Sequence, residues 1–347
     1  MKKQVGVIGS GNFGTALSVL LASNADVLMH TRTSEKAKSI NTGHQNLGWH
    51  LPERIHATSN LEELCNLCPV IFIAIPSVHF SSLVQNISPF LNPRHIVVHG
   101  VKGFEIQDEK EKAYQINPHE ELPVRTMSEV IKRETNVIRI GCLSGPNLSS
   151  ELLKGLPAAS VIASSYDEVI LTTQKLLDQK TFKVYSSHHL KGTEFAGAFK
   201  NIIAIASGLV NGQDLGKNLE SIIITKGLQE MLLTGGSLGI DPAAFLGLAG
   251  IGDLIATSTS PHSRNFRFGY ALGKNNNAED IMAATHELVE GISTTRIMYD
   301  YAKIMKLQCP VVRMVYDVIF NKKGVKESLD HIYEDRTSYD VRLFGDL

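Results

Sequence analysis

The sequence predicts an α/β domain with a mostly parallel sheet over residues 1–187, followed by an all-helical domain over residues 188–347. Short apolar runs alternate with helical segments up to about Ser187, which is typical of parallel strands covered by helices on both faces. Beyond Ser187 the helix-like apolar spacing continues without a convincing strand. A chain of 347 residues is also longer than one ordinary core supports.

The first domain opens with a strand, a tight turn and a helix. Residues 4–9 have the apolar pattern of a buried strand, and residues 15–23 have the spacing of an apolar helix. Further strands are expected at residues 27–30, 70–75, 95–99, 137–140 and 159–163. In the second domain, helices are expected at residues 195–210, 219–234, 242–248, 278–289, 294–305 and 311–321.

The composition is that of a globular protein with a small-molecule substrate. The chain is 43% hydrophobic and 20% charged, with a formal net charge of -1. A nearly neutral chain has no strong electrostatic field that attracts nucleic acid or an anionic membrane surface. Lys2 and Lys3 precede an apolar run that resembles a secretory signal, but glycines interrupt that run. Since no other segment is long and apolar enough to span a bilayer, we expect no stable membrane insertion.

Four cysteines indicate neither a disulfide framework nor a metal site. Cys65 and Cys68 have metal-like spacing, but no second pair or histidine cluster completes a ligand set. We therefore expect them to pack in or beside a helix, and we expect no metal. So few cysteines in a long chain fit a reducing compartment, and we expect a cytoplasmic protein.

The turn between the first strand and the first helix has the pattern G-x-G-x-x-G, with glycines at Gly9, Gly11 and Gly14. The first glycine permits the sharp turn, the second lets the backbone approach a pyrophosphate, and the third allows close packing of helix on strand. Backbone N–H groups at the helix start then face the phosphates. In this strand-turn-helix context the motif predicts a doubly wound sheet of the Rossmann type that binds a dinucleotide; the alternative is a turn that serves packing alone.

The end of the second strand bears on the choice of cofactor. Enzymes selective for NAD commonly place an acidic residue there to hold the ribose 2′-hydroxyl. Here Arg32 stands near that position, with hydroxyl side chains beside it, and no acid occurs until Glu35. A cation with adjacent hydroxyls suits a 2′-phosphate, so NADP(H) is favoured, while NAD(H), with Glu35 on the ribose and a solvated Arg32, stays open.

Two lysines are candidates for work on a carbonyl substrate. Lys102 lies between Gly100 and Gly103 just after a predicted strand, and the carboxyl ends of such strands face the ligand crevice. Lys200 lies on a helix face of small or apolar residues, where desolvation is expected to lower its pKa and make it a workable general base. The alternatives are a surface lysine in a turn for Lys102 and a lysine that snorkels from a buried helix for Lys200.

A third segment supplies an acid and donors for an anion. Asp253 is an isolated acid among glycines and aliphatic residues, so its burial requires a cationic partner, for which Lys200 is a candidate. Ser263, Arg264 and Asn265 then concentrate hydroxyl, guanidinium and amide donors where a helix could begin. This donor set suits a phosphate or a carboxylate, and the alternative is a solvated loop with a helix cap.

The chain resembles the bacterial NAD(P)-dependent glycerol-3-phosphate dehydrogenases over nearly its whole length. The segments that carry the resemblance are residues 9–16, 101–103, 144–147, 154–157, 197–201, 247–254, 263–265 and 289–291. Many families share the glycine turn alone, whereas the lysine, aspartate and Ser-Arg-Asn segments in this order are more specific. The resemblance implies an oxidoreductase that interconverts dihydroxyacetone phosphate and sn-glycerol 3-phosphate and supplies glycerophospholipid synthesis.

The resemblance also implies roles for individual residues. Lys200 would be the proton acceptor in the oxidation direction. The substrate would contact Lys102, Gly145, Lys200, Asp253, Ser263, Arg264 and Asn265. The cofactor site would be lined by Asn12, Phe13, Arg32, Lys102, Ser149, Arg264, Leu288 and Glu290, beside the three glycines of the turn. We hypothesise that the segment 263–265 holds the substrate phosphate, that the two lysines bracket the carbonyl oxygen, and that Asp253 orients Lys200.

Some positions depart from the family pattern, and some questions stay open. His30 replaces the aromatic residue common at the end of the second strand, residues 147 and 149 vary in the family, and the extension after Lys322 has no assigned role. The rival interpretations are a two-domain hydroxyacid dehydrogenase with a carboxylate substrate and a nicotinamide-binding sensor without catalysis. The helical domain has enough apolar surface for a homodimer.

Overall fold

The computed structural model describes residues 4–105, 124–275, 280–281 and 288–333, and these form two compact units. We call them the sheet unit, with residues 4–105, 124–197 and 243–253, and the helical unit, with residues 198–242 and the described residues from 254 onward. The sheet unit thus reaches beyond residue 187, because the first turns of a long helix and a segment near residue 250 pack with the sheet. The domain ranges 1–187 and 188–347 stay a prediction.

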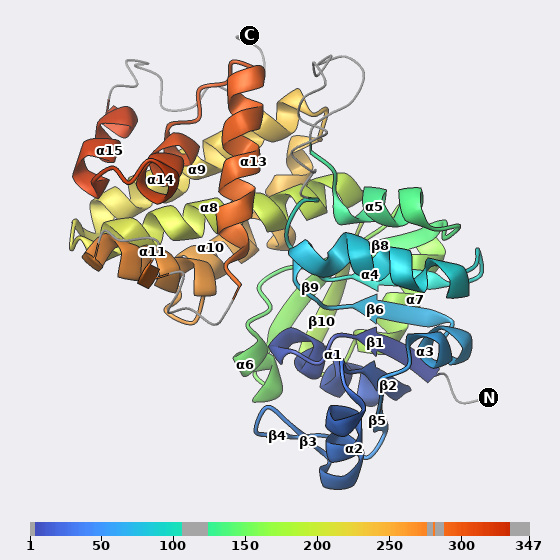
Figure 1. Cartoon of the computed structure of the whole chain (residues 1–347). Helices are drawn as coiled ribbons and strands as arrows, with labels where there is room; N and C mark the ends of the chain where they lie inside the picture. Colours follow the sequence, from blue (N-terminus) through green and yellow to red (C-terminus); the bar gives the residue numbers. More distant parts are fainter. Residues whose placement is uncertain (1–3, 106–123, 276–279, 282–287, 334–347) are drawn as a thin grey trace. The chain divides into compact units, whose positions relative to one another are not determined.

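The sheet unit contains an eight-stranded sheet in the order β10-β9-β8-β7-β6-β1-β2-β5 (Figure 1). Neighbouring strands are parallel except for the antiparallel pair of β8 and β9. The strands are β1 (Gln4–Ile8), β2 (Asp26–His30), β5 (Ile55–Thr58), β6 (Val70–Ile73), β7 (Ile96–His99), β8 (Arg139–Ser144), β9 (Ala158–Ala163) and β10 (Phe182–Ser187). A separate hairpin joins β3 (Gln45–Asn46) to β4 (Trp49–His50).

Helices cover both faces of this sheet, because alternate residues of each central strand point to opposite sides. In β1, Val5 and Val7 belong to one core cluster and Ile8 belongs to the other. The first cluster is shared with α1 (Asn12–Ala22), α2 (Ser34–Gly43), α6 (Ser149–Leu153) and α7 (Asp167–Leu177). The second is shared with α3 (Leu61–Leu67), α4 (Phe80–Ile87) and α5 (Met127–Glu134). The predicted mostly parallel, doubly wound sheet is confirmed.

The prediction missed β5 and β10, which are the two edge strands of the sheet. An edge strand pairs on one side only and carries fewer apolar residues than a central strand. In β10, Phe182 and Val184 are buried while Lys183 and Tyr185 are exposed, so the strand alternates instead of reading as a continuous apolar run. The apolar-run criterion therefore found the interior strands and overlooked the edges.

The helical unit is built mainly from helices predicted by apolar spacing. Its helices are α8 (Leu190–Gly212), which begins in the sheet unit, α9 (Gly216–Ser237), α10 (Asp253–Ser258), α11 (Arg264–Asn275), α13 (Glu290–Ile304), α14 (Pro310–Phe320) and α15 (Val325–Tyr333). Helix α14 packs against α9, α13 and α15 (Figure 1). The helix expected at 278–289 lies largely outside the described residues, and residues 288–289 are not helical. The described part of the extension after Lys322 contains α15.

The α-helix expected at 242–248 is not formed. A 3-10 helix, η4 (Pro242–Phe245), is followed by a π-helical turn, η5 (Leu248–Gly252), before α10 begins. A side chain at Gly250 would overlap the backbone of Phe245, so this close coil depends on glycine. The turn contacts β9 and delivers Asp253 as the first residue of α10.

The cysteines pack as expected. Cys65 lies in α3 and Cys68 caps that helix, and both are buried in the second core cluster. Burial raises the pKa of Cys65 to about 11 and that of Cys68 to about 12, so both thiols are poor nucleophiles. Among the helices of the described residues, none combines the length and apolarity required to cross a bilayer.

Candidate active site

The glycine turn has the backbone geometry that a pyrophosphate site requires. Gly9 adopts a φ of +124°, a conformation that favours glycine, and Gly14 packs so closely that a side chain would overlap the carbonyl of Gly9. Gly11 differs, because a Cβ built there meets no atom within 4 Å. The turn therefore has open space in front of its second glycine, at the start of α1 (N-cap Gly11). A dinucleotide pyrophosphate fits this cradle.

Side chains from outside the motif hold the turn in place. The carbonyl oxygen of Ser10 accepts hydrogen bonds from Asn46 Nδ2 at 3.0 Å and from Lys36 Nζ at 3.4 Å. Asn46, from the β3–β4 hairpin, also donates to Thr15 Oγ1 at 2.7 Å. Neither residue was predicted, and for Asn46 the reason is that a two-residue strand gives no periodic signal in the sequence. Asn12, the first residue of α1, is exposed next to the turn.

Phe13 connects the turn to the segment that carries Lys102. A side chain at Gly100 would come within 2.5 Å of the Phe13 ring, so glycine at this position makes room for the aromatic side chain. Gly100 directly follows β7, and Lys102 lies two residues farther along. The ring of Phe13 and the loop of Lys102 are thus neighbours within the sheet unit.

Arg32 lies where a cofactor ribose is expected. It follows β2 by two residues and is exposed, and Thr33 next to it caps α2 by accepting a hydrogen bond from the Lys36 N–H at 3.3 Å. Glu35 is also exposed, and hydrogen bonds from its own backbone N–H and from Ser34 lower the pKa of its carboxyl group. An accessible cation and an accessible carboxylate therefore both follow β2, and the preference for NADP(H) stays a prediction.

Lys102 forms a buried ion pair with Asp253. Its Nζ lies 2.6 Å from Oδ2 of Asp253 and donates a second hydrogen bond of 3.1 Å to the carbonyl oxygen of Gly145. Asp253 is only 2% exposed, whereas Lys102 is half-buried. The surface-lysine alternative for Lys102 is therefore wrong. The structure supplies the cation that Asp253 requires, and it comes from Lys102; the expected pairing of Asp253 with Lys200 stays a prediction.

Two glycines shape the surroundings of this pair. Gly145, whose carbonyl accepts from Lys102, has a φ of +142° that favours glycine, and a Cβ there would lie 3.2 Å from the backbone of Ala159 and Ser160. A Cβ on Gly197 of α8 would lie 3.2 Å from Ser144 Oγ and 3.6 Å from Cγ of Lys102. The aliphatic stem of Lys102 thus passes directly beside the start of α8.

Lys200 is buried in the helical unit, as its small and apolar surroundings predicted. It is 4% exposed, and its Nζ donates a hydrogen bond to Thr257 Oγ1. The interpretation as a lysine that snorkels to solvent is therefore wrong. Thr257 was not predicted, although it follows Asp253 by four residues on α10 and so shares its side of that helix. Thr257 of α10 and Lys200 of α8 therefore meet within the helical unit.

Four glycines bring the backbones of α8 and α11 together. Side chains at Gly208 and Gly212 of α8 would overlap the backbone of Phe266 and Tyr270 in α11. Gly269 and Gly273 of α11 similarly face the carbonyls of Ile205 and Leu209 in α8. Residue numbers rise together along the contact, so the two helices run in the same direction with a constant offset.

The same offset continues one turn earlier at a pair of asparagines. Asn265 Nδ2 donates to Asn201 Oδ1 at 2.9 Å, and Asn265 Oδ1 accepts the N–H of Gly291 at 2.9 Å. A Cβ on Gly291 would lie 2.8 Å from both the Asn201 carbonyl oxygen and Asn265 Oδ1. Because Lys200 precedes Asn201 and Arg264 precedes Asn265, the glycine contact fixes the spacing of lysine and arginine within the helical unit.

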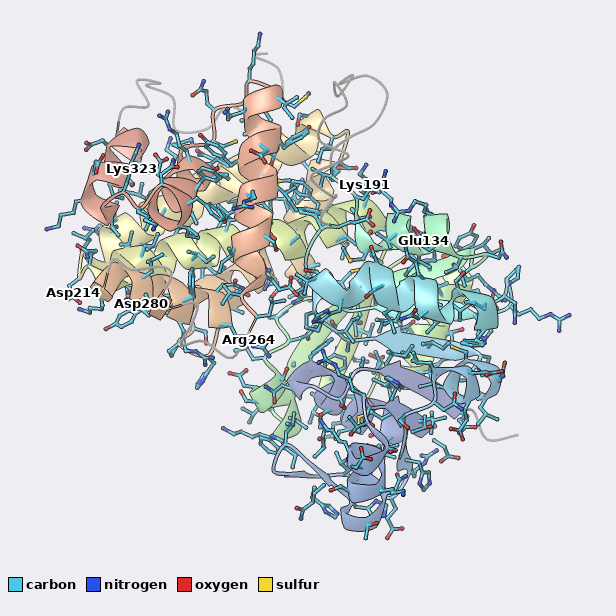
Figure 2. All side chains as sticks on the ribbon, viewed as in Figure 1. Glu134, Lys191, Asp214, Arg264, Asp280 and Lys323 are labelled. Carbon is cyan, nitrogen blue, oxygen red and sulfur yellow. The ribbon has the colours of Figure 1, made fainter. Side chains whose placement is uncertain are left out.

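The remaining predicted residues lie at helix starts. Arg264, labelled in Figure 2, is exposed at the first position of α11. Ser263 precedes it, is 5% exposed and accepts a hydrogen bond from the N–H of Phe266 at 3.3 Å. Glu290 begins α13, next to the clamped Gly291, and Leu288 is 39% exposed just before it. Ser149 begins α6 in the sheet unit.

A doubly wound sheet with an open glycine cradle is the architecture of a dinucleotide-binding protein. Residues 4–170 match the family described as NAD-dependent glycerol-3-phosphate dehydrogenase N-terminus, and residues 189–330 match the corresponding C-terminus. The chain therefore belongs to the NAD(P)-dependent glycerol-3-phosphate dehydrogenase family.

Individual relatives are similar over their whole length. The chain is 36% identical over 339 residues to glycerol-3-phosphate dehydrogenase (NAD(P)+) of Halothermothrix orenii, with 96% of this chain and 95% of the relative covered. It is 36% identical over 328 residues to the Exiguobacterium enzyme, with 92% of each chain covered. A crystal structure of glycerol-3-phosphate dehydrogenase from Coxiella burnetii has a TM-score of 0.86 at 27% identity, covering 96% of this chain and 99% of the other.

The fold alone does not choose the substrate. A ketopantoate reductase from Ralstonia eutropha has a TM-score of 0.57 at 12% identity, covering 94% of this chain and 99% of the other. That likeness concerns the fold only. The family matches over 4–170 and 189–330 therefore carry the assignment, and the rival assignment to a carboxylate-specific dehydrogenase is not favoured.

Proposed function

We propose that this protein interconverts dihydroxyacetone phosphate and sn-glycerol 3-phosphate by hydride transfer with NAD(P)H. The observation that carries the proposal is the fixed register of α8 and α11, which holds a buried lysine, Lys200, and an exposed arginine, Arg264, next to a hydrogen-bonded asparagine pair. A substrate with a carbonyl at one end and a phosphate at the other requires a proton donor and an anion-binding group at a set spacing.

The phosphate is proposed to bind at the start of α11. Arg264 is the first residue of α11 and Ser263 directly precedes it, and the N-terminal end of a helix favours anions. Asn265 contributes by holding Asn201 and Gly291 in place behind Arg264. Arg264 supplies the charge that makes this site selective for a dianion.

The two lysines are proposed to act on the carbonyl oxygen. Lys200 donates a proton to that oxygen in the reduction direction and takes one from the alcohol in oxidation, with Thr257 orienting its ammonium. Lys102 is held by Asp253 and by the Gly145 carbonyl, and from this fixed position it is proposed to contact the substrate oxygen. The nicotinamide, when bound, supplies the hydride to the carbonyl carbon in reduction and accepts it in oxidation.

The cofactor is proposed to lie with its pyrophosphate over Gly11 and its nicotinamide side toward the loop of Lys102. The open space at Gly11 and the packing of Phe13 on Gly100 support this placement. Arg32 favours NADP(H), and NAD(H) use is retained by the neighbouring Glu35. Ser149, Leu288 and Glu290 are proposed to complete the lining.

A substrate panel tests the proposal most directly. Oxidation of NADPH or NADH is followed by absorbance after addition of dihydroxyacetone phosphate or, separately, of a 2-keto acid. We expect turnover only with the phosphate, and turnover only with the keto acid would overturn the proposal. Lys200→Ala is expected to lower kcat by about 100-fold or more while cofactor binding stays near the wild-type level. Near-normal turnover of that variant would remove Lys200 from the mechanism.

We further propose a cytoplasmic, phospholipid-supplying role and a homodimer as the assembly. The four free cysteines, which are all buried, support a reducing compartment. Size-exclusion chromatography with light scattering measures the assembly, and a monomer at working concentrations would contradict the homodimer.

A further inference from the structure

A second buried carboxylate lies close to the Lys102 loop and has no role in the reaction as described so far. Glu194 of α8 is 3% exposed. Its Oε1 accepts the N–H of Ser128 at 2.7 Å, and its Oε2 accepts the hydroxyl of Ser128 at 2.6 Å. Ser128 is the second residue of α5, so this N–H is one that the helix itself leaves unpaired. The helix start stabilises the buried negative charge.

His99 brings the end of β7 to the same carboxylate. It is the last residue of β7 and is fully buried, and its Nε2 lies 3.0 Å from Oε1 of Glu194. The two side chains are in contact without the alignment of a hydrogen bond. The Lys102 loop begins at the next residue, so Glu194 packs against the base of that loop while it holds the start of α5.

Glu194 also controls what packs on the stem of Lys102. Gly197 follows Glu194 by one helical turn, and it is Gly197 that faces Lys102 Cγ and Ser144. A shift of this turn of α8 would therefore move directly into Lys102. The charges share one environment, because Glu194 and Asp253 raise the pKa of the fully buried Cys142 thiol in addition to the effect of burial, while Lys102 lowers it.

We propose that Glu194 is a positioning residue that sets the place of Lys102 from both ends, through His99 at the base of its loop and through Gly197 against its stem. The inference rests on the proposed role of Lys102 in binding the substrate carbonyl. The titratable and charged groups that face this neighbourhood are Asp253 of α10, Cys142 of β8, His99 of β7 and Glu194 itself. Glu194 thereby supplies a fixed negative charge near a functional cation.

The test compares Glu194→Gln with Glu230→Gln. Glu230 is a matched control, because it is 4% exposed and accepts the N–H groups of Val311 at 2.5 Å and Val312 at 3.0 Å at the start of α14. It lies in the helical unit and is not among the residues proposed for the reaction. Both substitutions replace one buried carboxyl group at a helix start, so they separate a general structural loss from a specific one. The two groups differ in charge, because burial raises the pKa of Glu230 to about 8.

For Glu194→Gln we expect kcat with dihydroxyacetone phosphate to fall by about 10- to 100-fold, since small misplacements of catalytic groups have effects of that size. The KM for NADPH should stay unchanged. The alkaline limb of the pH profile of kcat should move to lower pH, because the lost negative charge favoured the protonated form of nearby cations. Glu194→Asp, which keeps the charge, should restore the position of that limb, and Glu230→Gln should leave kcat and the profile unchanged.

Three results would overturn the inference. The first is a folded Glu194→Gln variant with the kcat and pH profile of the wild type. The second is an equal loss of kcat in Glu194→Gln and Glu230→Gln. The third is an alkaline limb of the pH profile that moves as far in Glu194→Asp as in Glu194→Gln. If Glu194→Gln does not fold, Ser128→Ala keeps the inference testable, because it removes one of the two bonds to the carboxylate and should give a smaller loss of kcat. Failure of the proposed function would appear instead in the wild-type enzyme, as absence of turnover with dihydroxyacetone phosphate.

Discussion

The contact between α8 and α11 predicts that Gly269→Ala damages activity far more than stability. The Cβ of the new side chain would overlap the carbonyl oxygen of Ile205 and lie 2.9 Å from the carbonyl carbon. Both atoms belong to backbone, so no side-chain rotation relieves the overlap. Restoring an ordinary carbon–oxygen contact requires the helices to separate by about 1 Å at this point.

The magnitudes of the two effects differ. Alanine is favoured over glycine inside a helix by about 1 kcal/mol, whereas forced overlap in a packed interior costs about 1–3 kcal/mol. The free energy of unfolding should therefore fall by about 0–2 kcal/mol. A displacement of about 1 Å between Lys200 and Arg264, by contrast, lowers turnover by about 100-fold. The Asn201–Asn265 hydrogen bond, one turn away, should be lost as well.

The assay measures kcat/KM for dihydroxyacetone phosphate together with the thermal midpoint of unfolding. Gly324→Ala is the control, because a Cβ at that glycine of the helical unit meets no atom within 4 Å and its φ is not positive. The control should match the wild type in both measurements. A folded Gly269→Ala variant with kcat/KM within about threefold of the wild type would refute the claim that this spacing matters to catalysis.

Three further predictions concern the sheet unit. Gly11→Ala should leave the unfolding temperature unchanged and raise the KM for NADPH, since its Cβ enters open space, whereas Gly14→Ala should lower the unfolding temperature because its Cβ overlaps a backbone carbonyl. Arg32→Ala should raise the KM for NADPH more than that for NADH, and equal losses would contradict contact with a 2′-phosphate. Burial tends to raise the pKa of Glu105, but hydrogen bonds from Arg133 and neighbouring donors lower it to about 2. This carboxylate therefore stabilises the fold above about pH 4.5 and loses that effect as the pH falls toward 2, so Glu105→Gln should cost about 1–3 kcal/mol at neutral pH and flatten the acid limb of a denaturation curve.

The sequence predicted the parts of the site that depend on local pattern. The glycine turn, the burial of Lys200 and the isolation of Asp253 all follow from residues within one turn or one helix face. The partner of Asp253 did not follow, because Lys102 lies 151 residues away and nothing in either segment encodes their meeting. Charge balance showed that a cation was required, and the sequence analysis named Lys200 as the candidate, a pairing that stays a prediction.

The contribution of Asn46 was beyond prediction for a different reason. Its side chain holds the Ser10 carbonyl from a hairpin of two-residue strands, where neither apolar periodicity nor a motif marks the position. Only the paired backbone of the hairpin places this amide over the turn. The sequence thus identifies the glycines of the turn but does not identify Asn46, whose side chain holds the turn in place.

The contact of α8 with α11 was only partly predictable. The glycine pairs that make it are visible in the sequence, but their meaning depends on two distant segments at once. Gly208 and Gly212 are four residues apart, as are Gly269 and Gly273, and each pair lies on one side of its helix. Each pair alone weakens its helix, since glycine is a poor helix former. One pair follows the Lys200 segment and the other follows the Arg264 segment. The contact between the two backbones explains why both helices carry such a pair. The glycines therefore lower the stability of each helix separately and give the two helices a spacing that larger residues would forbid.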